Sequence, residues 1–164
     1  MLNMHDCVSM DVTASFLDVL PPQPGAYALW LQVTEPLTLR VGSLGEATVT
    51  PGDWVYVGSA LGPGGLRARV AHHARIARRP HWHIDYLRRH AVLTMVWHSV
   101  DLLRREHQWA RLFQDLGGVA ALPRFGSSDC QCPAHLFHFP HRPDGATFVE
   151  SVRARYPNHP PVGL

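Results

Sequence analysis

The sequence predicts an α+β protein with a small antiparallel sheet flanked by helices, in a chain whose 164 residues suit one domain. Two observations lead to this prediction. Short apolar runs separated by Gly- and Pro-rich turns fill residues 25–58, as in strands that follow one another through turns. Farther along, residues 65–79 and 102–116 repeat their apolar side chains at helical spacing and are followed by Pro or Gly.

The expected strands are apolar runs bounded by turn formers. Pro21-Pro22-Gln23-Pro24 stops any preceding helix and makes a stiff entry into the first strand. Gly42–Gly45 and Pro51-Gly52-Asp53 are turns by residue chemistry. The expected strands are Gly25–Val33, Leu37–Val41, Glu46–Val49, Trp54–Gly58, Ala91–Val100 and His135–Phe139. Because the early strands follow one another closely, we expect antiparallel pairing.

The expected helices lie mainly in the second half of the chain. Asp101 is the expected N-cap of the helix that follows it, and Gly117-Gly118 ends that helix. The last residues, PNHPPVGL, are expected to form a loose tail. The expected helices are Thr13–Leu20, Gly65–Arg79, a short one in His81–Leu87, Leu102–Leu116 and Gly145–Tyr156.

Two basic residues of the predicted helix Gly65–Arg79 fall on its apolar side. At 100° per residue, Arg69 and His73 lie in the same arc as Leu66 and Val70. A charge that faces a sheet costs free energy unless it is paired or used. Arg69 and His73 are therefore candidates for a buried pair or for a functional site.

Glu106 occupies a corresponding place on the predicted helix Leu102–Leu116. It lies four residues after Leu102 and three before Trp109, which belong to the apolar stripe of that helix. A carboxylate in such a stripe is either buried beside a cation or directed into a site. A purely structural ion pair between Arg69 and Glu106 is one alternative, and a functional cleft is the other.

Positive charge is concentrated in one part of the chain. The net charge is only +2, so the overall balance does not indicate a nucleic-acid partner. Residues 64–90, however, carry seven arginines and five histidines against one acid, Asp85. Arg67, Arg75 and Arg78 face away from the apolar side and offer a surface for phosphates, or a merely solvated helix face. The basic density favours nucleic acid.

The sequence indicates a cytoplasmic protein without a membrane partner. No stretch approaches the roughly 20 apolar residues of a membrane span. The N-terminus carries two aspartates and lacks the basic region of a secretory signal. Three cysteines are an odd number and imply no disulfide framework, which fits a reducing compartment.

Several motifs, in order along the chain, resemble the GIY-YIG nuclease superfamily. Gly25-Ala26-Tyr27 and Tyr56-Val57-Gly58 are similar to its two signature strands, Arg69-x3-His73 to its arginine and histidine, and Glu106 to its metal-binding glutamate. The longer motifs RVGSLGE, YVGSALGPGGLRAR, HWHIDYL and GSSDCQCPAHLF are similar to an uncharacterised prokaryotic branch with a GIY-YIG-like core, which also occurs fused to endonuclease III-type repair glycosylases. The resemblance covers Gly25–Phe139.

The resemblance implies a metal-dependent endonuclease that hydrolyses DNA phosphodiester bonds in repair or processing. The implied core is a three-stranded antiparallel sheet, here with short strands inserted between the two tyrosine motifs. The domain would span residues 25–140, between an N-terminal extension (1–24) and a C-terminal helix and tail (141–164). The implied catalytic residues are Tyr27, Tyr56, Arg69, His73 and Glu106, with Glu106 holding one Mg²⁺ or Mn²⁺ ion.

Nucleic acid, expected to be DNA, would contact the surface around this site. The asparagine that follows the glutamate in the superfamily has no clear match, and Asp129 or Ser128 are the candidates for its place. In strands, aromatic residues are usually core, so a structural role for Tyr27 and Tyr56 is the alternative. The expected nucleic-acid contacts are Gly58, Ser59, Arg67, Arg75, Arg78, His81 and His83.

A second group of side chains offers zinc ligands. His81-x-His83 and Cys130-x-Cys132-x2-His135 supply imidazoles and thiolates, which would form a structural zinc site if the fold brings them together. The C-x-C spacing differs from the usual C-x2-C knuckle, and Trp82 between the two histidines favours packing or substrate contact instead. Two other functions stay open: a nucleic-acid-binding module without cleavage, and a metal-dependent hydrolase that uses the HxH pair.

Overall fold

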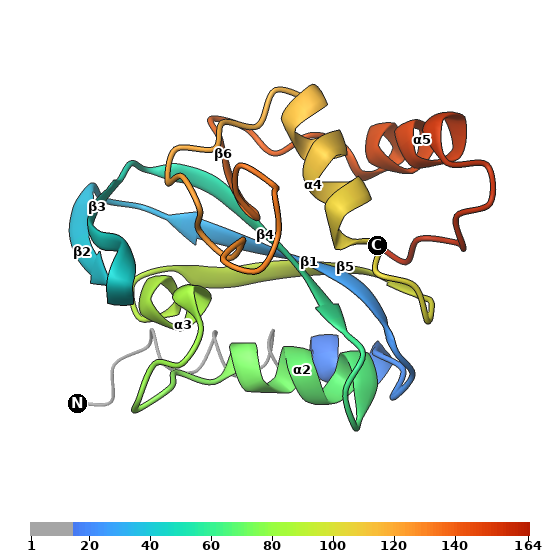
Figure 1. The fold of residues 1–164 in the computed structure, drawn as a ribbon, viewed down its shortest axis with the longest axis horizontal. Helices are drawn as coiled ribbons and strands as arrows, with labels where there is room; N and C mark the ends of the chain where they lie inside the picture. The colour runs from blue at the N-terminus through green and yellow to red at the C-terminus, as the bar shows by residue number, and fades with distance from the viewer. Residues whose placement is uncertain (1–14) are drawn as a thin grey trace.

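One antiparallel sheet lies between two layers of helices in the computed structural model, which describes residues 15–164 (Figure 1). The strands stand in the order β5 (Val92–Val100), β1 (Gly25–Val33), β4 (Gly52–Ala60) and β6 (Leu136–Phe139), each antiparallel to its neighbour. The predicted α+β class is confirmed. The sheet has four strands rather than three because β6 pairs with the outer edge of β4.

The segment between the two tyrosine motifs folds as a separate hairpin. β2 (Leu37–Val41) and β3 (Gly45–Val49) pair with each other around a 3-10 turn, η1 (Gly42–Leu44). β1 and β4 pair directly along their whole length, with Tyr27 opposite Gly58. The inserted hairpin therefore leaves the ladder between the two signature strands intact.

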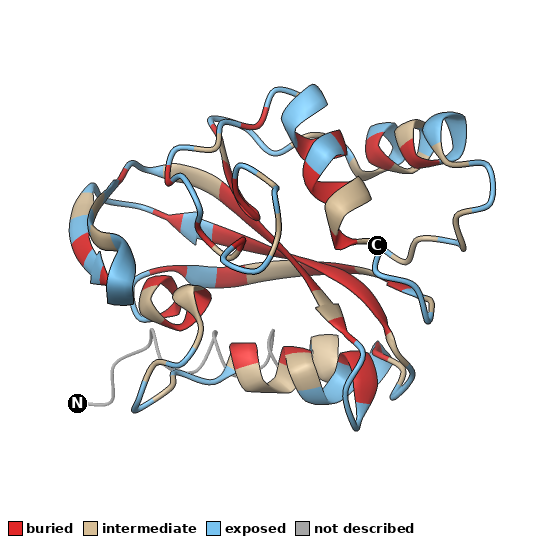
Figure 2. Cartoon of the chain, in the orientation of Figure 1, coloured by how far each residue is buried: buried red, intermediate tan, exposed pale blue. Residues whose placement is uncertain are grey.

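Helices cover both faces of the sheet (Figures 1 and 2). Alternation along β1 sends Leu29 into the core beneath α2 and α3, and Trp30 into the core beneath α4 and α5. Within residues 15–164, no helix combines the length and the apolar character that a membrane crossing needs. Besides the helical residues 15–19, the helices of the described part of the chain are α2 (Gly65–Ala74), α3 (His83–Arg88), α4 (Glu106–Asp115) and α5 (Gly145–Arg155).

The N-terminal segment is tied to the start of α2. Residues 15–19 are helical, as predicted, whereas Thr13 and Ala14 lie outside the described residues. Leu20 is buried in the core, and its carbonyl accepts a hydrogen bond from Arg67 Nε at 2.8 Å. Arg67 was predicted to contact phosphate, and one of its hydrogen-bond donors is thus already used within the fold.

The helix predicted over Gly65–Arg79 ends earlier, at Ala74. Arg75 adopts an extended conformation, so Arg75 and Arg78 lie in the loop after α2. The physical reason is the buried guanidinium of Arg88, which donates to the carbonyls of His73 at 2.8 Å and Ala74 at 3.1 Å. These carbonyls would otherwise be left unpaired at the end of the helix.

The helix predicted over Leu102–Leu116 begins later, at Glu106. Asp101 is not its N-cap, because the Asp101 carboxylate accepts the Leu103 N–H at 3.0 Å and Arg105 Nε at 2.7 Å. These bonds stabilise a bend between β5 and α4, and they leave Leu102 exposed. Glu106 is therefore the first residue of α4 instead of lying in its second turn.

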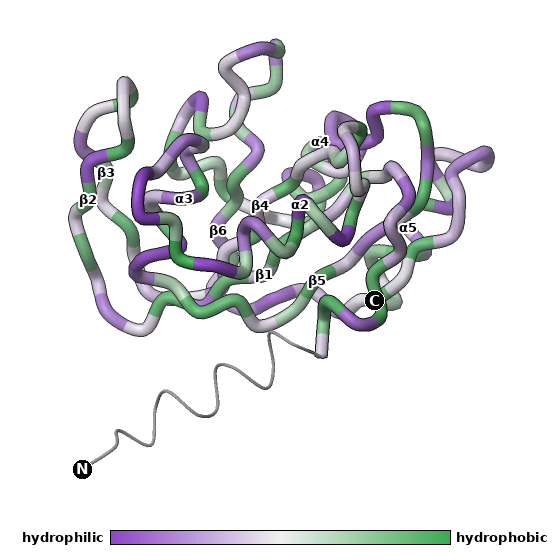
Figure 3. The backbone as a smooth tube through the Cα atoms, turned by 90° about the horizontal axis from the view of Figure 1, so that it is seen from below, coloured by the Kyte–Doolittle hydropathy of each residue, from purple (hydrophilic) through white to green (hydrophobic). Residues whose placement is uncertain are grey.

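The C-terminal residues are packed, and the prediction of a loose tail is wrong. Gly163 pairs with His98 of β5 as an antiparallel bridge, and the chain end lies beside β5 (Figures 1 and 3). Trp109 Nε1 of α4 donates to His159 Nε2 at 2.8 Å. Ser99 donates to the carbonyl of Pro161 at 2.9 Å. These bonds give the tail polar partners that the Pro-rich sequence did not indicate.

Candidate functional site

A cleft of about 480 Å³ lies where the outer edge of β4 becomes free. β6 pairs with β4 only as far as Tyr56, and the Val57 N–H then donates to the carbonyl of His135 at 2.8 Å. Beyond Val57, β1 is the only strand beside β4 in the part of the chain that the structure describes. Side chains from the two helical layers can therefore meet around this edge.

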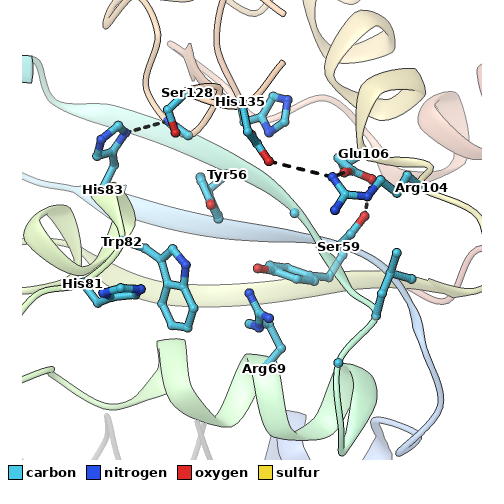
Figure 4. A pocket seen from close by; sticks show the side chains of 16 residues that line it. Tyr56, Ser59, Arg69, His81, Trp82, His83, Arg104, Glu106, Ser128 and His135 are labelled. Atoms are coloured by element: carbon cyan, nitrogen blue, oxygen red, sulfur yellow. Dashed lines mark hydrogen bonds and ion pairs between the residues drawn. The ribbon is translucent and has the colours of Figure 1, made fainter.

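Four of the five predicted catalytic residues line this cleft. They are Tyr27 of β1, Tyr56 of β4, Arg69 of α2 and Glu106 of α4. Figure 4 shows Arg69 rising from α2 on one side of the cleft while Glu106 enters from α4 on the other. The fifth residue, His73, is 1% exposed and lies behind Tyr27, outside the lining.

The two tyrosines are almost completely buried. Their ring centroids are 6.5 Å apart, and both side chains border the cleft. Burial is the main cause that raises the pKa of Tyr27 well above its usual value, and Tyr56 adds to it. Burial likewise raises the pKa of Tyr56, against the opposing charge of Arg69. Both phenols are consequently protonated at neutral pH, and the Tyr56 hydroxyl can donate a hydrogen bond into the cleft.

The residue opposite Tyr27 on β4 has to be small. A Cβ atom on Gly58 would collide with the Oη and Cζ atoms of Tyr27. The phenol therefore lies across the Gly58 backbone. This position brings Tyr27 Oη within 3.0 Å of His73 Nε2.

His73 connects Tyr27 to a carboxylate. Its Nδ1 atom lies 3.7 Å from Asp85 Oδ1, which is an electrostatic contact slightly beyond hydrogen-bond distance. Burial lowers the pKa of His73, although Asp85 opposes that shift. The imidazole is therefore neutral near neutral pH. The nearby carboxylate favours the proton on Nδ1, which leaves Nε2 as the acceptor for the Tyr27 hydroxyl.

Asp85 has a role that its sequence position did not indicate. Its Oδ2 atom accepts the backbone N–H groups of His81 at 2.9 Å and Trp82 at 3.0 Å, at the start of α3. Burial raises the pKa of Asp85, but His73 and these two N–H groups outweigh burial, and the net shift is downward. Asp85 is thus an ionised carboxylate fixed behind His73.

Arg69 is held by an aromatic ring instead of an acid. Its guanidinium lies 4.7 Å from the ring centroid of Trp82, within the range of a cation–π contact. Among the ion pairs of the described residues, none includes Arg69, so the structural pair with Glu106, which was one of the two alternatives, does not form. The positive charge of Arg69 consequently remains open to the cleft.

Glu106 is 4% exposed and is surrounded by polar groups. The Ser59 hydroxyl donates to its Oε2 atom. Arg104 Nη1 and His107 Nε2 each lie 3.7 Å from its Oε1 atom. Arg104 also lies 3.8 Å from Asp129, across the rim of the cleft. Arg104 was missed by sequence reasoning, because it does not interrupt an apolar pattern, and Trp82 was expected to pack or to contact substrate but not to hold Arg69.

The predicted nucleic-acid contacts fall into two sets. Gly58, Ser59, His81 and His83 line the cleft, as do the two candidates for the missing asparagine, Ser128 and Asp129. The remaining three do not line it and are exposed on or after α2: Arg67, Arg75 and Arg78.

The predicted zinc ligands are only partly brought together. Cys130, Cys132 and His135 meet His107, with one ligand atom of each lying within 4.8 Å of those of the others. His81 and His83 are not members of this group, and His83 Nδ1 instead accepts the Gly126 N–H at 2.9 Å. The joint site of His81 and His83 with the C-x-C motif is therefore not formed. His107 follows Glu106 directly in the sequence. It could have been identified as a potential zinc ligand only from the path of the loop that carries Cys130 and Cys132.

Comparison with known families gives one match. The model of a family described as Domain of unknown function DUF123 matches residues 26–156, so the chain belongs to that family. Neither a curated protein nor a solved structure matches the chain.

Proposed function

We propose that this member of the DUF123 family is a metal-dependent nuclease of the GIY-YIG type, which hydrolyses phosphodiester bonds in DNA. The observation that carries the proposal is that four predicted catalytic residues converge in one cleft: Tyr27, Tyr56, Arg69 and Glu106. His73 is hydrogen-bonded to Tyr27 behind them. These residues come from the neighbouring strands β1 and β4 and from the helices α2 and α4, which cover opposite faces of the sheet.

Arg69 is the residue that binds the reacting phosphate. Its guanidinium carries no acidic partner and is kept in place by Trp82. A guanidinium can donate two parallel hydrogen bonds to a phosphoryl group and stabilise the negative charge that grows there during attack. Tyr56 donates from β4, since its raised pKa keeps it protonated.

Glu106 and Asp129 offer hard oxygen donors for one Mg²⁺ or Mn²⁺ ion. Both line the cleft, whose volume leaves room for the water molecules that these cations retain. Arg104, which lies between the two carboxylates and is exposed, can turn outward when a cation replaces it. A bound divalent cation would neutralise phosphoryl charge and make a nearby water more acidic.

The tyrosine–histidine–aspartate arrangement supplies the path for the proton. Tyr27 alone is a poor base, because burial raises its pKa. As the attacking water passes a proton to Tyr27 Oη, the phenolic proton passes to His73 Nε2, so Tyr27 stays neutral throughout. Asp85 then stabilises the imidazolium. His73 acts through Tyr27 and does not touch the substrate.

The test is a cleavage assay with purified protein on supercoiled plasmid, linear duplex, single-stranded and branched DNA, and RNA, with Mg²⁺ or Mn²⁺. Glu106→Gln should lower the cleavage rate by at least about 100-fold and leave DNA binding in place, because it removes the carboxylate charge with little change in shape. Glu150→Gln on the exposed face of α5 is the matched control and should cleave at the wild-type rate.

The outcomes separate the candidate functions. Cleavage that survives Glu106→Gln would contradict the proposed site. Salt-sensitive binding without cleavage of any substrate would leave a nucleic-acid-binding module. The absence of both binding and cleavage would remove nucleic acid as the partner.

A further inference from the structure

A cluster of four potential metal ligands lies beside the cleft and has no part in the proposed reaction. We call His107, Cys130, Cys132 and His135 the cysteine–histidine cluster. His107 Nδ1 lies 3.2 Å from Cys132 Sγ, and His135 Nε2 lies 3.4 Å from Cys130 Sγ. Zinc–sulfur bonds of about 2.3 Å and zinc–nitrogen bonds of about 2.0 Å place such atoms about 3.5 Å apart around a tetrahedral ion. Each of these two pairs thus already has nearly the spacing of zinc ligands, and all four ligand atoms lie within 4.8 Å of one another.

We propose that the cysteine–histidine cluster binds one zinc ion, and that this ion fastens the loop 123–135 to the start of α4. Two thiolates and two imidazoles form a donor set that zinc prefers and that Mg²⁺ does not. Two thiolates also balance the charge of the ion without any further acid.

An ion can reach the cluster from solvent. Cys130, Cys132 and His107 are half-buried, and they border a second hollow of about 400 Å³ beside α4. His135 is the buried ligand and borders the main cleft. The ion would therefore bind in the wall between the two hollows.

Glu106 supports the same site from outside. His107 directs Nδ1 toward Cys132, and its other nitrogen, Nε2, lies 3.7 Å from Glu106 Oε1. Metal-binding histidines usually have a carboxylate or carbonyl beside the nitrogen that does not bind the metal, which orients the ring. Glu106 would thus stand between the two metal sites, as a ligand in the cleft and as a support for His107.

The ion would hold a wall of the cleft in place. The loop 123–135 is closed at its base by the pairing of Arg124 N with the Pro133 carbonyl at 2.7 Å, and by His135 N with the Phe125 carbonyl at 2.8 Å. Its tip carries Asp129 into the cleft, where an exposed contact with Arg104 at 3.8 Å links it to the segment before α4. Exposed ion pairs contribute little. A zinc ion on Cys130 and Cys132 would be a far stronger link.

The test measures metal binding by the full chain without nucleic acid. Protein purified without chelators should contain one zinc per chain, and Co²⁺ in its place should give the visible bands of a tetrahedral site with thiolate ligands. Cys132→Ser and His107→Ala should weaken zinc binding by more than about 100-fold, since loss of a ligand exceeds the effect of losing an outer contact. Cys7→Ser, at the cysteine outside the described residues, is the matched control and should bind like the wild type.

Hydrogen exchange gives a second measurement. Zinc should slow amide exchange in residues 126–132 of the wild type and have no such effect in Cys132→Ser. Substoichiometric zinc, zinc retained by both ligand variants, or a Cys130–Cys132 disulfide in the purified protein would each overturn the site. Glu106→Gln separates this inference from the proposed function: it should still bind one zinc at saturation, whether or not the wild type cleaves DNA.

Discussion

Two clusters of histidine side chains flank the cleft, and their surroundings give them different chemistry. The histidine–aspartate cluster, His72, His73 and Asp85, lies beneath the tyrosines, whereas the cysteine–histidine cluster lies in the opposite wall. His73 and Asp85 are almost completely buried, and hydrogen bonds to Tyr27 and to the backbone already occupy them. The cysteine–histidine cluster is half-open, and its nitrogen and sulfur atoms face one another. Similar ligand types therefore suit the proposed proton transfer in one wall and the proposed metal binding in the other.

The largest difference between the two clusters should appear when one histidine of each is replaced and the stability of the metal-free protein is measured. His73→Ala should lower the free energy of unfolding by about 2–4 kcal/mol, because it leaves a cavity among the rings of Tyr27, Tyr56 and Trp82. His107→Ala removes a partly exposed ring and should lower it by less than about 1 kcal/mol. Urea unfolding in EDTA, followed by tryptophan fluorescence, measures both. Equal losses would remove the distinction between the two clusters.

The second-largest effect should be a loss of stability in acid that depends on Asp85 of the histidine–aspartate cluster. The folded pKa of Asp85 is lowered, so its carboxylate adds stability above its usual pKa of about 3.9, and this contribution is lost as pH falls below that value. The free energy of unfolding should therefore decrease more steeply below pH ~4 in the wild type than in Asp85→Asn. Asp18→Asn, at an exposed position in the helical residues 15–19, serves as the control with a wild-type slope. An unchanged slope in Asp85→Asn would show that Asp85 is not held in its charged form.

The smallest effect should come from the titration of His73. Burial lowers its folded pKa, so the unfolded chain binds the proton more readily, and stability falls as pH drops below about 6.5. His73→Gln should reduce, but not abolish, the loss of stability between pH 7 and pH 5, because His98 and His159 also have lowered pKa values. Calorimetric melting at a series of pH values measures this difference. A variant that loses as much stability as the wild type would indicate that His73 is charged in the folded protein.

The strands and the inward-facing residues could be predicted because they follow local periodicity. β1 and β2 begin and end where the apolar pattern does, and Arg69 and His73 face inward as the helical spacing requires. Helix ends were predicted less well. Arg88 ends α2 from a distant position in the sequence, and no pattern within α2 itself signals that contact.

The parts of the site that were missed depend on long-range contacts. Asp85 stands in a basic segment and gains its role only when α3 packs beside α2. The cysteine–histidine cluster needs the loop 123–135 to return to α4, so the sequence offered His81 and His83, and not His107, as possible companions of Cys130. Local sequence identifies such residues one at a time, and the fold determines which of them meet.

The missing side chain at position 58 has a consequence for aligning other sequences with this one. Tyr27 can reach His73 only because Gly58, over which its phenol ring lies, has no side chain. In an alignment, the residue at this position is thus a sharper marker than either tyrosine. A sequence that keeps both tyrosines but places alanine or any larger residue there cannot form the same phenol–imidazole bond. Such a sequence should be sorted into a group with different chemistry, even when every polar residue of the cleft is present.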